Sequence, residues 1–252
     1  MEKEDLLLQK RFAELAKRSY VQNMFTFTDF LSLPELDLFY QNEPQLKFAG
    51  VTVFGGAKGT DRKVVRFGNP EELGYEEPFP IVCIAMEPLL EKFGENLNHR
   101  DYLGALMNLG IERENIGDIF IKGKKGYVFC LERIADFIME NLSQVRHTHV
   151  KLRVLEKEEE FVQKEVEEMA VLSAAERIDG VIAKVYNFSR SQSIDHFRAK
   201  KVYVNSRLCE NNSYQLKQGD IISVRGYGKF VYNGVEYQTK KGKLSVKVGI
   251  YK

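Results

Sequence analysis

Residues 78–155 carry an ordered series of hydrophobic patterns that leaves few possible folds. The apolar run FPIVCIAM predicts a strand, and Tyr102, Leu103, Leu106 and Leu109 recur at helical spacing within NHRDYLGALMNLGI. DIFIKG and GYVFCL predict a hairpin that turns at Lys124–Lys125. ERIADFIMENL then predicts a second helix, and the alternation in VRHTHVKLRVL predicts a last strand. The segment therefore has the element order β-α-β-β-α-β.

That order is the ferredoxin-like, or split βαβ, plan. RNA-recognition domains use it, and so do many unrelated enzymes and regulators, so the order alone names no function. The Phe- and Tyr-rich signature of an RNA-reading central strand is not evident in GYVFCLE. We therefore expect residues 76–155 to form a domain that is RRM-like in shape only.

Residues 1–75 predict a separate N-terminal α+β domain. A helix over about residues 3–18 would bring Leu8, Phe12 and Leu15 to one face. Short helices broken at Pro34 are expected next, and LKFAGVTVF and KVVRF then predict two strands joined by the loop GGAKGTDR. The chain as a whole is therefore expected to be α+β and multidomain.

The net charge of +1 conceals a split between the two parts of the chain. Residues 177–252 contain 15 Lys and Arg against 5 Asp and Glu, whereas residues 1–176 contain 22 against 31. Residues 156–172, EKEEEFVQKEVEEMAVL, form an acidic linker between them, and the sequence leaves open whether its end is a strand. A basic module suits a polyanionic partner, although a merely solvated basic face gives the same count.

Two helices are predicted at the start of the basic module, residues 173–252. Ser173 with Glu176 has the spacing of a capping box, and four apolar residues follow it at helical spacing: Ile178, Val181, Ile182 and Val185. Ser189 with Gln192 predicts a second capping box, which opens a helix that buries Ile194 and Phe197. Arg190 lies in the first turn of this second helix, where free backbone N–H groups favour a phosphate.

Strands are predicted in the rest of the module. VYV ends at Asn205, a tight turn at Gly219–Asp220 leads into IISVRGYG, and KLSVKVGIY alternates as a last strand. Asn233–Gly234 between apolar runs predicts a hairpin turn. Four aromatic residues interleave with the basic ones and either stack on bases or pack the core, and for Phe188 core packing is favoured. They are Tyr186, Phe188, Tyr203 and Tyr227.

These residues resemble the S4 RNA-binding domain (α-L type). The resemblance rests on four motifs in the family's order: Arg177-Ile178-Asp179, Ser189-Arg190-Ser191, Val202-Tyr203-Val204-Asn205 and Gly219-Asp220-Ile221. Lys200 stands about where the family usually has glycine, and a left-handed backbone there would be costly for lysine. From the resemblance and the basic clustering together, the candidate RNA contacts are Arg177, Ser189, Arg190, Ser191, Arg198, Lys200, Lys201, Asn205, Arg207 and Lys229.

The whole architecture resembles the bacterial YlmH family, through the N-terminal domain, the middle segment with NHRDYLGALMNLGIERENIGDIFI, and the S4 tail. The resemblance implies a cytoplasmic, non-catalytic protein of ribosome-associated quality control. Its implied partners are ribosomal RNA of the 50S subunit and peptidyl-tRNA, with division proteins as further candidates. Two other functions stay open: an accessory to an RNA-modifying enzyme, as in S4-linked pseudouridine synthases, and a division-linked scaffold.

Signals for catalysis are weak. The sequence has no GxxxxGK[ST] loop, Rossmann fingerprint, GxSxG elbow or HExxH motif, so we expect neither catalytic residues nor a cofactor. His147 and His149 lack further ligands nearby, so no metal site is expected. The loop GGAKGTDR is either a flexible connection or a phosphate cradle assisted by Lys58 and Arg62. No apolar run is long enough to span a membrane, and three widely spaced cysteines fit a reducing compartment.

Overall fold

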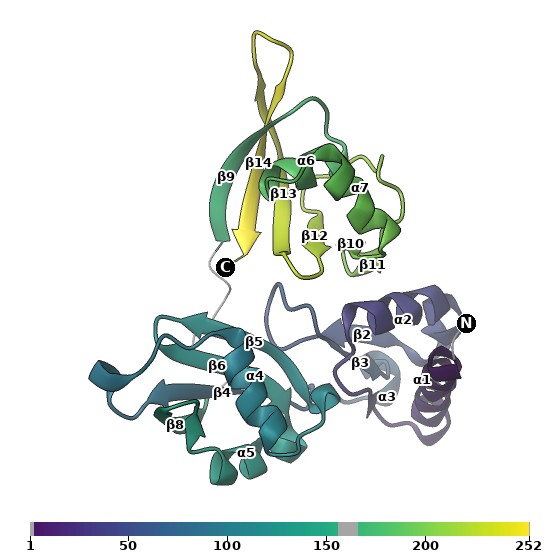
Figure 1. The fold of residues 1–252 in the computed structure, drawn as a ribbon. Coiled ribbons are helices and arrows are strands. Elements are labelled where there is room, and N and C mark those ends of the chain that lie inside the picture. The colour runs from purple at the N-terminus through teal and green to yellow at the C-terminus, as the bar shows by residue number, and fades with distance from the viewer. Residues whose placement is uncertain (1–2, 156–165, 252) are drawn as a thin grey trace. The chain divides into compact units, whose positions relative to one another are not determined.

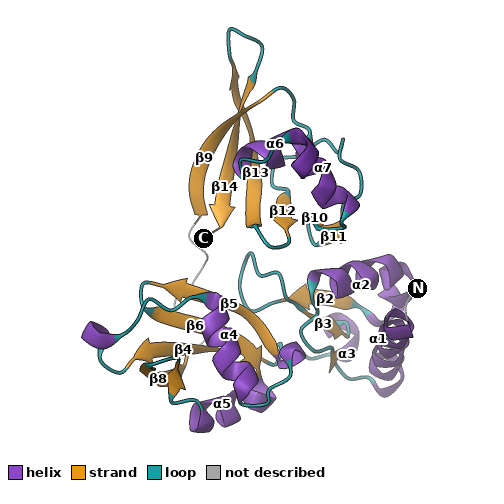
Figure 2. Cartoon of the chain, viewed as in Figure 1, coloured by secondary structure: helices purple, strands orange, loops and turns teal. Residues whose placement is uncertain are grey.

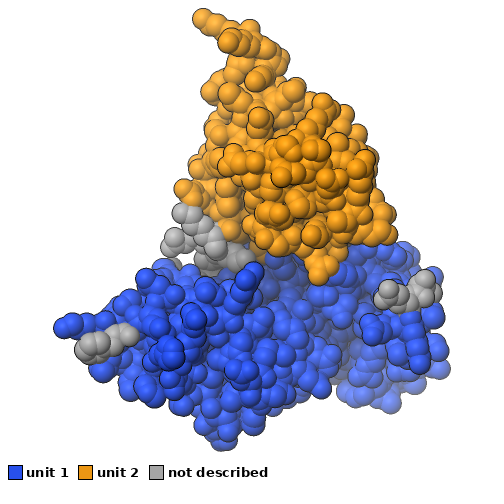
Figure 3. Space-filling view, viewed as in Figure 1, with its two compact units in different colours: residues 1–163 blue, residues 164–252 orange. Residues whose placement is uncertain are grey.

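Three β-sheets of three, five and six strands organise the part of the chain that the structure describes (Figure 1). The structure is a computed structural model that describes residues 3–155 and 166–251. Seven α-helices accompany the sheets in those ranges, so the fold is α+β as expected (Figure 2). The chain divides into two compact units, residues 1–163 and 164–252, which are coloured separately in Figure 3. None of the described helices is long and apolar enough to cross a membrane.

The first unit begins with two helices that pack on the three-stranded sheet, whose order is β1-β3-β2. Helix α1 (Lys3–Gln22) buries Phe12 and Leu15, and Leu8 packs against the same cluster, which confirms the predicted face. The remaining elements are β1 (Thr26–Phe27), α2 (Leu33–Leu46), a 3-10 turn (Lys47–Ala49), β2 (Val51–Phe54), β3 (Val64–Phe67) and α3 (Pro70–Leu73). Strands β2 and β3 are the two predicted on either side of the GGAKGTDR loop, but the first part of the predicted strand LKFAGVTVF is wrong, because residues 46–49 form the end of α2 and the 3-10 turn.

The prediction that helices break at Pro34 is wrong. Pro34 lies in the first turn of α2, where a missing N–H leaves no helical hydrogen bond unmade. The backbone N–H of Ser32 donates to the Glu35 carboxylate at 2.6 Å, which fixes the start of the helix. Pro34 therefore helps to begin one long helix.

The five-stranded sheet follows in the chain and has the order β5-β6-β4-β8-β7, with every pair antiparallel. Its elements are β4 (Ile81–Pro88), α4 (His99–Asn108), β5 (Ile116–Lys122), β6 (Lys125–Leu131), α5 (Ala135–Asn141), β7 (Gln144–Val145) and β8 (Thr148–Val154). Short 3-10 turns lie at Glu91–Phe93, Arg113–Asn115 and Glu132–Ile134. The predicted β-α-β-β-α-β order is present, with the two-residue strand β7 added at the edge.

The N-terminal and middle segments share a hydrophobic cluster. Phe30 and Val64 from the first segment pack with Cys83, Ala85 and Phe129 from the five-stranded sheet. All five side chains are at most 3% exposed. The two segments therefore lie together in the first compact unit.

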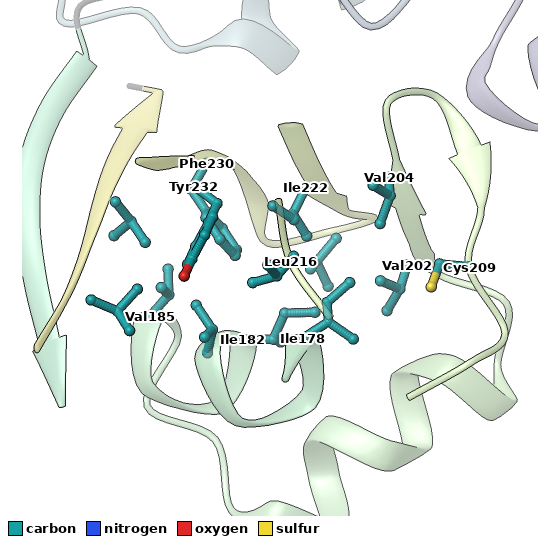
Figure 4. Packing of buried hydrophobic residues seen from close by; sticks show 14 of the residues in the cluster. Ile178, Ile182, Val185, Val202, Val204, Cys209, Leu216, Ile222, Phe230 and Tyr232 are labelled. Atoms are coloured by element: carbon teal, nitrogen blue, oxygen red, sulfur yellow. The ribbon is translucent and has the colours of Figure 1, made fainter. Parts of the chain in front are cut away.

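The second unit is a six-stranded antiparallel sheet, of order β11-β10-β12-β13-β14-β9, with two helices. Its elements are β9 (Val166–Ser173), α6 (Ile178–Val185), α7 (Arg190–Arg198), β10 (Val202–Val204), β11 (Arg207–Leu208), β12 (Ile221–Val224), β13 (Gly228–Gln238) and β14 (Leu244–Tyr251). The four apolar residues predicted at helical spacing on α6 are all buried. Figure 4 shows Ile178 and Ile182 facing Ile222 and Phe230 of the sheet.

Strand β9 includes the end of the expected acidic linker. It pairs along its whole length with β14, from Val166 opposite Tyr251 to Ser173 opposite Leu244. The C-terminal sheet therefore extends upstream of residue 173. The first part of the expected linker, residues 156–165, lies outside the described residues.

Two local predictions for this unit are wrong. Ser173 does not cap a helix, because it ends β9 and its hydroxyl donates to the Ala175 carbonyl at 2.7 Å, while Arg177 occupies the N-cap of α6. Asn233–Gly234 forms a bulge within β13 and not a turn. The hairpin turns instead between Thr239 and Gly242.

Candidate nucleic-acid interface

Helix α7 begins with the predicted capping box. The Gln192 backbone N–H donates to the Ser189 hydroxyl at 3.2 Å, and the Ser189 backbone N–H donates to the Gln192 side chain at 2.8 Å. The Ser191 hydroxyl lies 3.0 Å from that of Ser189. Arg190 is exposed, and no hydrogen bond or ion pair joins its side chain to a residue in the described ranges. A cation is thus available beside a helix start that favours anions.

The end of α7 is closed by a left-handed lysine. Lys200 has a φ of 53°, and its backbone N–H donates to the Phe197 carbonyl at 3.0 Å. The Lys201 N–H donates to the His196 carbonyl at 3.0 Å, which completes a Schellman motif. This is the position where the sequence departs from the S4 pattern, so lysine adopts here a conformation that favours glycine.

The charged side chains at this end differ in their pairing. Arg198 contacts Asp195 at 3.2 Å and Lys200 contacts Glu210 at 3.4 Å, and all four side chains are largely exposed. Lys201 is also exposed. Exposed pairs of this kind contribute little and open easily, so the cations stay available to another anion.

Aromatic rings lie between the two ends of α7. The rings of Phe188 and Tyr227 are 4.7 Å apart, and that of His196 lies 4.7 Å from Phe188 and 4.8 Å from Tyr227. Tyr186 stacks on Phe188 at 5.6 Å. Tyr186 and Phe188 pack against the core, as favoured for Phe188, whereas Tyr227 is 52% exposed. Burial and the charge of Lys201 lower the pKa of His196, which favours its neutral form.

Arg225 joins this group, and the sequence analysis did not single it out. It follows β12 in the turn that carries Tyr227, and its backbone N–H donates to the Lys201 carbonyl at 2.9 Å. The pairing of Val202 with Val224 is what brings the two cations together. The run Arg225-Gly226-Tyr227, a cation and an aromatic ring in a glycine turn, was the available signal. We define the α7 surface as Arg190, His196, Lys201, Arg225 and Tyr227, with Phe188 beneath them.

Asn205 and Arg207 lie at the other end of β10 and β12. Asn205 has a φ of 51°, donates to the Asp220 carboxylate at 2.9 Å and accepts from the Ile221 N–H at 2.9 Å. Its amide therefore fixes the turn between β10 and β11. Arg207 is exposed on β11 at that turn, so the structure separates both residues from Lys201 by the length of β10.

Arg177 and Lys229 are the least available of the candidates. The Arg177 guanidinium donates to both carboxylate oxygens of Asp179, at 3.1 and 2.8 Å, and its side chain is 36% exposed. Asp179 is buried and also accepts from the Gly180 N–H. Lys229 is 2% exposed, and its ammonium lies 5.4 Å from the centre of the Tyr251 ring. The structure does not bring Lys229 to the surface, although alternation along β13 places it on the face opposite the core residues Phe230 and Tyr232.

Comparisons with known proteins identify the family of the chain. A family model described as "Putative RNA-binding domain in YlmH" matches residues 77–169. A Bacillus subtilis (strain 168) protein named "Ribosome-associated protein quality control protein P2" is 30% identical over 204 residues, which are 78% of this chain and 76% of that protein. The chain belongs to the YlmH family. Among solved structures, this YlmH-family chain is similar to "Cell division protein ylmH from Streptococcus pneumoniae", with a TM-score of 0.49, 15% identity, and coverage of 62% of this chain and 93% of that one.

Two other candidate sites of this YlmH-family chain are the phosphate cradle of the GGAKGTDR loop and the histidine pair His147 and His149. In the GGAKGTDR loop, the backbone N–H groups of Asp61 and Arg62 donate to the Asp118 carboxylate at 2.6 and 3.3 Å, so an internal anion fills the cradle. The Arg62 guanidinium donates to the carbonyls of Phe30 and Ile116 and is likewise engaged. His147 and His149 are exposed, and no group of three potential metal ligands occurs in the described ranges.

Proposed function

We propose that the chain is a non-catalytic RNA-binding protein of ribosome-associated quality control, which docks through its C-terminal unit on ribosomal RNA of a 50S subunit that carries peptidyl-tRNA. The name of the B. subtilis relative and the description of the matched family model support this assignment. In this proposal the C-terminal unit is an S4 domain, the five-stranded sheet belongs to an RRM-like domain, and the protein acts in the cytoplasm.

One observation carries the proposal: exposed cations lie at both ends of α7, and Arg225 and the exposed ring of Tyr227 lie beside its C-terminal end. Arg190 comes from the start of α7, Lys201 from just after its end, and Arg225 and Tyr227 from the turn after β12. Arginine and lysine neutralise phosphates, and an exposed tyrosine can stack on an unpaired base. This combination suits structured RNA better than an acidic protein, which offers no bases to stack.

The candidate RNA contacts fall into groups according to their distance from the α7 surface. Ser189, Arg190, Ser191, Arg198, Lys200 and Lys201 belong to α7 and its two ends, and we propose them as the main contacts. Asn205 and Arg207 are proposed as peripheral contacts, and Arg177 as a residue that positions the start of α6. We leave Lys229 out, because a side chain this buried cannot reach a phosphate.

Binding of the full chain to purified 50S subunits tests the proposal. If about five to eight phosphates are neutralised, affinity should fall by orders of magnitude between about 50 and 200 mM salt. Arg190→Ala combined with Arg225→Ala should weaken binding and reduce the salt slope by about 2, or roughly 1 per lost phosphate contact. Lys247→Ala is the matched control, because Lys247 lies on β14 with its ammonium 2.7 Å from Glu168.

The double variant should bind 50S subunits more weakly than the Lys247→Ala control. Its melting temperature should stay unchanged, since both arginines are exposed. Equal affinities and slopes for the two variants would remove the α7 surface from the interface. A flat salt response of the wild-type protein would reject electrostatic docking on RNA altogether.

A further inference from the structure

The five-stranded sheet of the first unit has two faces with different coverings. Ile84 and Met86 of β4 point to the face that helices α4 and α5 cover, and they share a cluster with Tyr102 and Ile138. Cys83 and Ala85 alternate with them and point to the opposite face. The helices α4 and α5 do not cover this second face.

The N-terminal segment covers part of the second face. Phe30 and Val64 seal the part around Cys83, Ala85 and Phe129. This region is therefore apolar core and cannot be reached by a ligand. The rest of the same face lies farther along β4, at Glu87.

Three cations contact Glu87 on this uncovered part. The Lys125 ammonium lies 3.1 Å from the Glu87 carboxylate, that of Lys151 lies 3.4 Å away, and the Arg153 guanidinium lies 4.0 Å away. The strand register places Lys122 directly opposite Lys125, so it points to the same face. We call Glu87, Lys122, Lys125, Lys151 and Arg153 the Glu87 corner.

Among the described residues, the Glu87 corner has an excess of positive charge at the surface. It contains four cations and one carboxylate, and the charge of Glu91 also acts on Lys125. The side chains of Lys125, Lys151 and Arg153 are 43%, 62% and 52% exposed. Burial acts to raise the pKa of Glu87, but Lys125 and Lys151 outweigh it and lower the pKa, so the carboxylate is ionised. A phosphate can share these cations without displacing a buried group.

We propose that the Glu87 corner is a second RNA-binding site, which holds the phosphates of a single-stranded segment across strands β5, β6, β4 and β8. Tyr127, half-buried on the same face opposite Ala85, supplies a ring at its edge. The matched family model spans these strands but assigns no residue or face. The site goes beyond the proposed function, because it lies in a different compact unit from the α7 surface.

Fluorescence anisotropy with a labelled oligouridylate of about 20 nucleotides, titrated with the full chain over a series of salt concentrations, tests the site. Lys151→Ala combined with Arg153→Ala should weaken binding and reduce the salt slope by about 1.4, since each phosphate contact on a single strand contributes about 0.7. Glu87→Gln should tighten binding by about twofold to fivefold, because it removes a competing negative charge. The control is Lys10→Ala combined with Lys17→Ala, which removes two exposed cations of α1.

RNA affinity should fall in the Lys151→Ala/Arg153→Ala variant and rise in Glu87→Gln. These opposite changes distinguish RNA binding from an ion-pair network that is purely structural. A network that only stabilises the sheet would lower the melting temperature in both variants and leave RNA affinity at the control value, which would overturn the proposal. Weakened binding of a polyglutamate peptide with unchanged RNA binding would overturn it too, in favour of an acidic protein ligand. Repeating the titrations with Arg190→Ala present separates this site from the α7 surface, so either proposal can fail alone.

Discussion

Replacing Lys200 by glycine should stabilise the C-terminal unit, although it deletes an ion pair. A left-handed residue with a Cβ costs about 1–2 kcal/mol, and Lys200 has a φ of 53°. Glycine adds freedom to the unfolded chain, which costs about 0.4–1 kcal/mol. The exposed contact of Lys200 with Glu210 at 3.4 Å contributes at most about 1 kcal/mol.

Central values for these effects leave a net stabilisation of about 0.3 kcal/mol for Lys200→Gly. For a unit of this size, that corresponds to a rise in Tm of about 1–2 °C. Scanning calorimetry of the full chain measures the change, and hydrogen exchange of the α7 amides identifies which transition belongs to this unit.

Lys201→Gly is the matched control, because Lys201 is the neighbouring lysine and its backbone is not left-handed. The control should lower the free energy of unfolding by about 0.4–1 kcal/mol, so the two variants should shift Tm in opposite directions. A Tm for Lys200→Gly at or below that of Lys201→Gly would refute the argument from backbone strain.

Three further predictions concern groups inside the two units. Arg62→Met removes the guanidinium that donates to the Phe30 and Ile116 carbonyls at 2.7 and 2.9 Å, so urea unfolding of the first unit should show a loss of about 3 kcal/mol; an unchanged midpoint would contradict this. The pKa of His196 is lowered from 6.5, so the native state binds fewer protons than the unfolded chain, and Tm should fall as the pH drops through that value; His196→Gln should show less of this fall, and an equal fall would refute the assignment. Burial raises the pKa of the Cys130 thiol to about 12, so iodoacetamide should label it at about pH 8 only after unfolding, and labelling of the folded protein would show that the thiol is accessible.

Elements whose pattern and tertiary surroundings agree were predictable from the sequence. Helix α6 is an example, because its four apolar residues at helical spacing meet the sheet they need to pack on. The Ser189–Gln192 capping box is another, since every hydrogen bond of that motif lies within four residues. The order of the middle strands and helices followed from periodicity for the same reason.

The failures occur where long-range strand pairing overrides a local signal. Ser173 has the spacing of a helix cap, but eight paired residues of β9 and β14 hold it in the sheet. Asn233–Gly234 has turn chemistry, but β13 continues past it, because its apolar residues on both sides pair with β14. The contact of Lys229 with the Tyr251 ring and the place of Arg225 beside Lys201 depend on strand register, which no local pattern reveals.

Sedimentation of the tagged protein through a sucrose gradient of cell lysate tests the central claim most directly. The account predicts that the wild-type protein migrates with free 50S subunits and that the Arg190→Ala variant, equally stable, stays at the top of the gradient. Wild-type protein that remains at the top at low salt, even with stalled complexes supplied, would contradict docking on the ribosome.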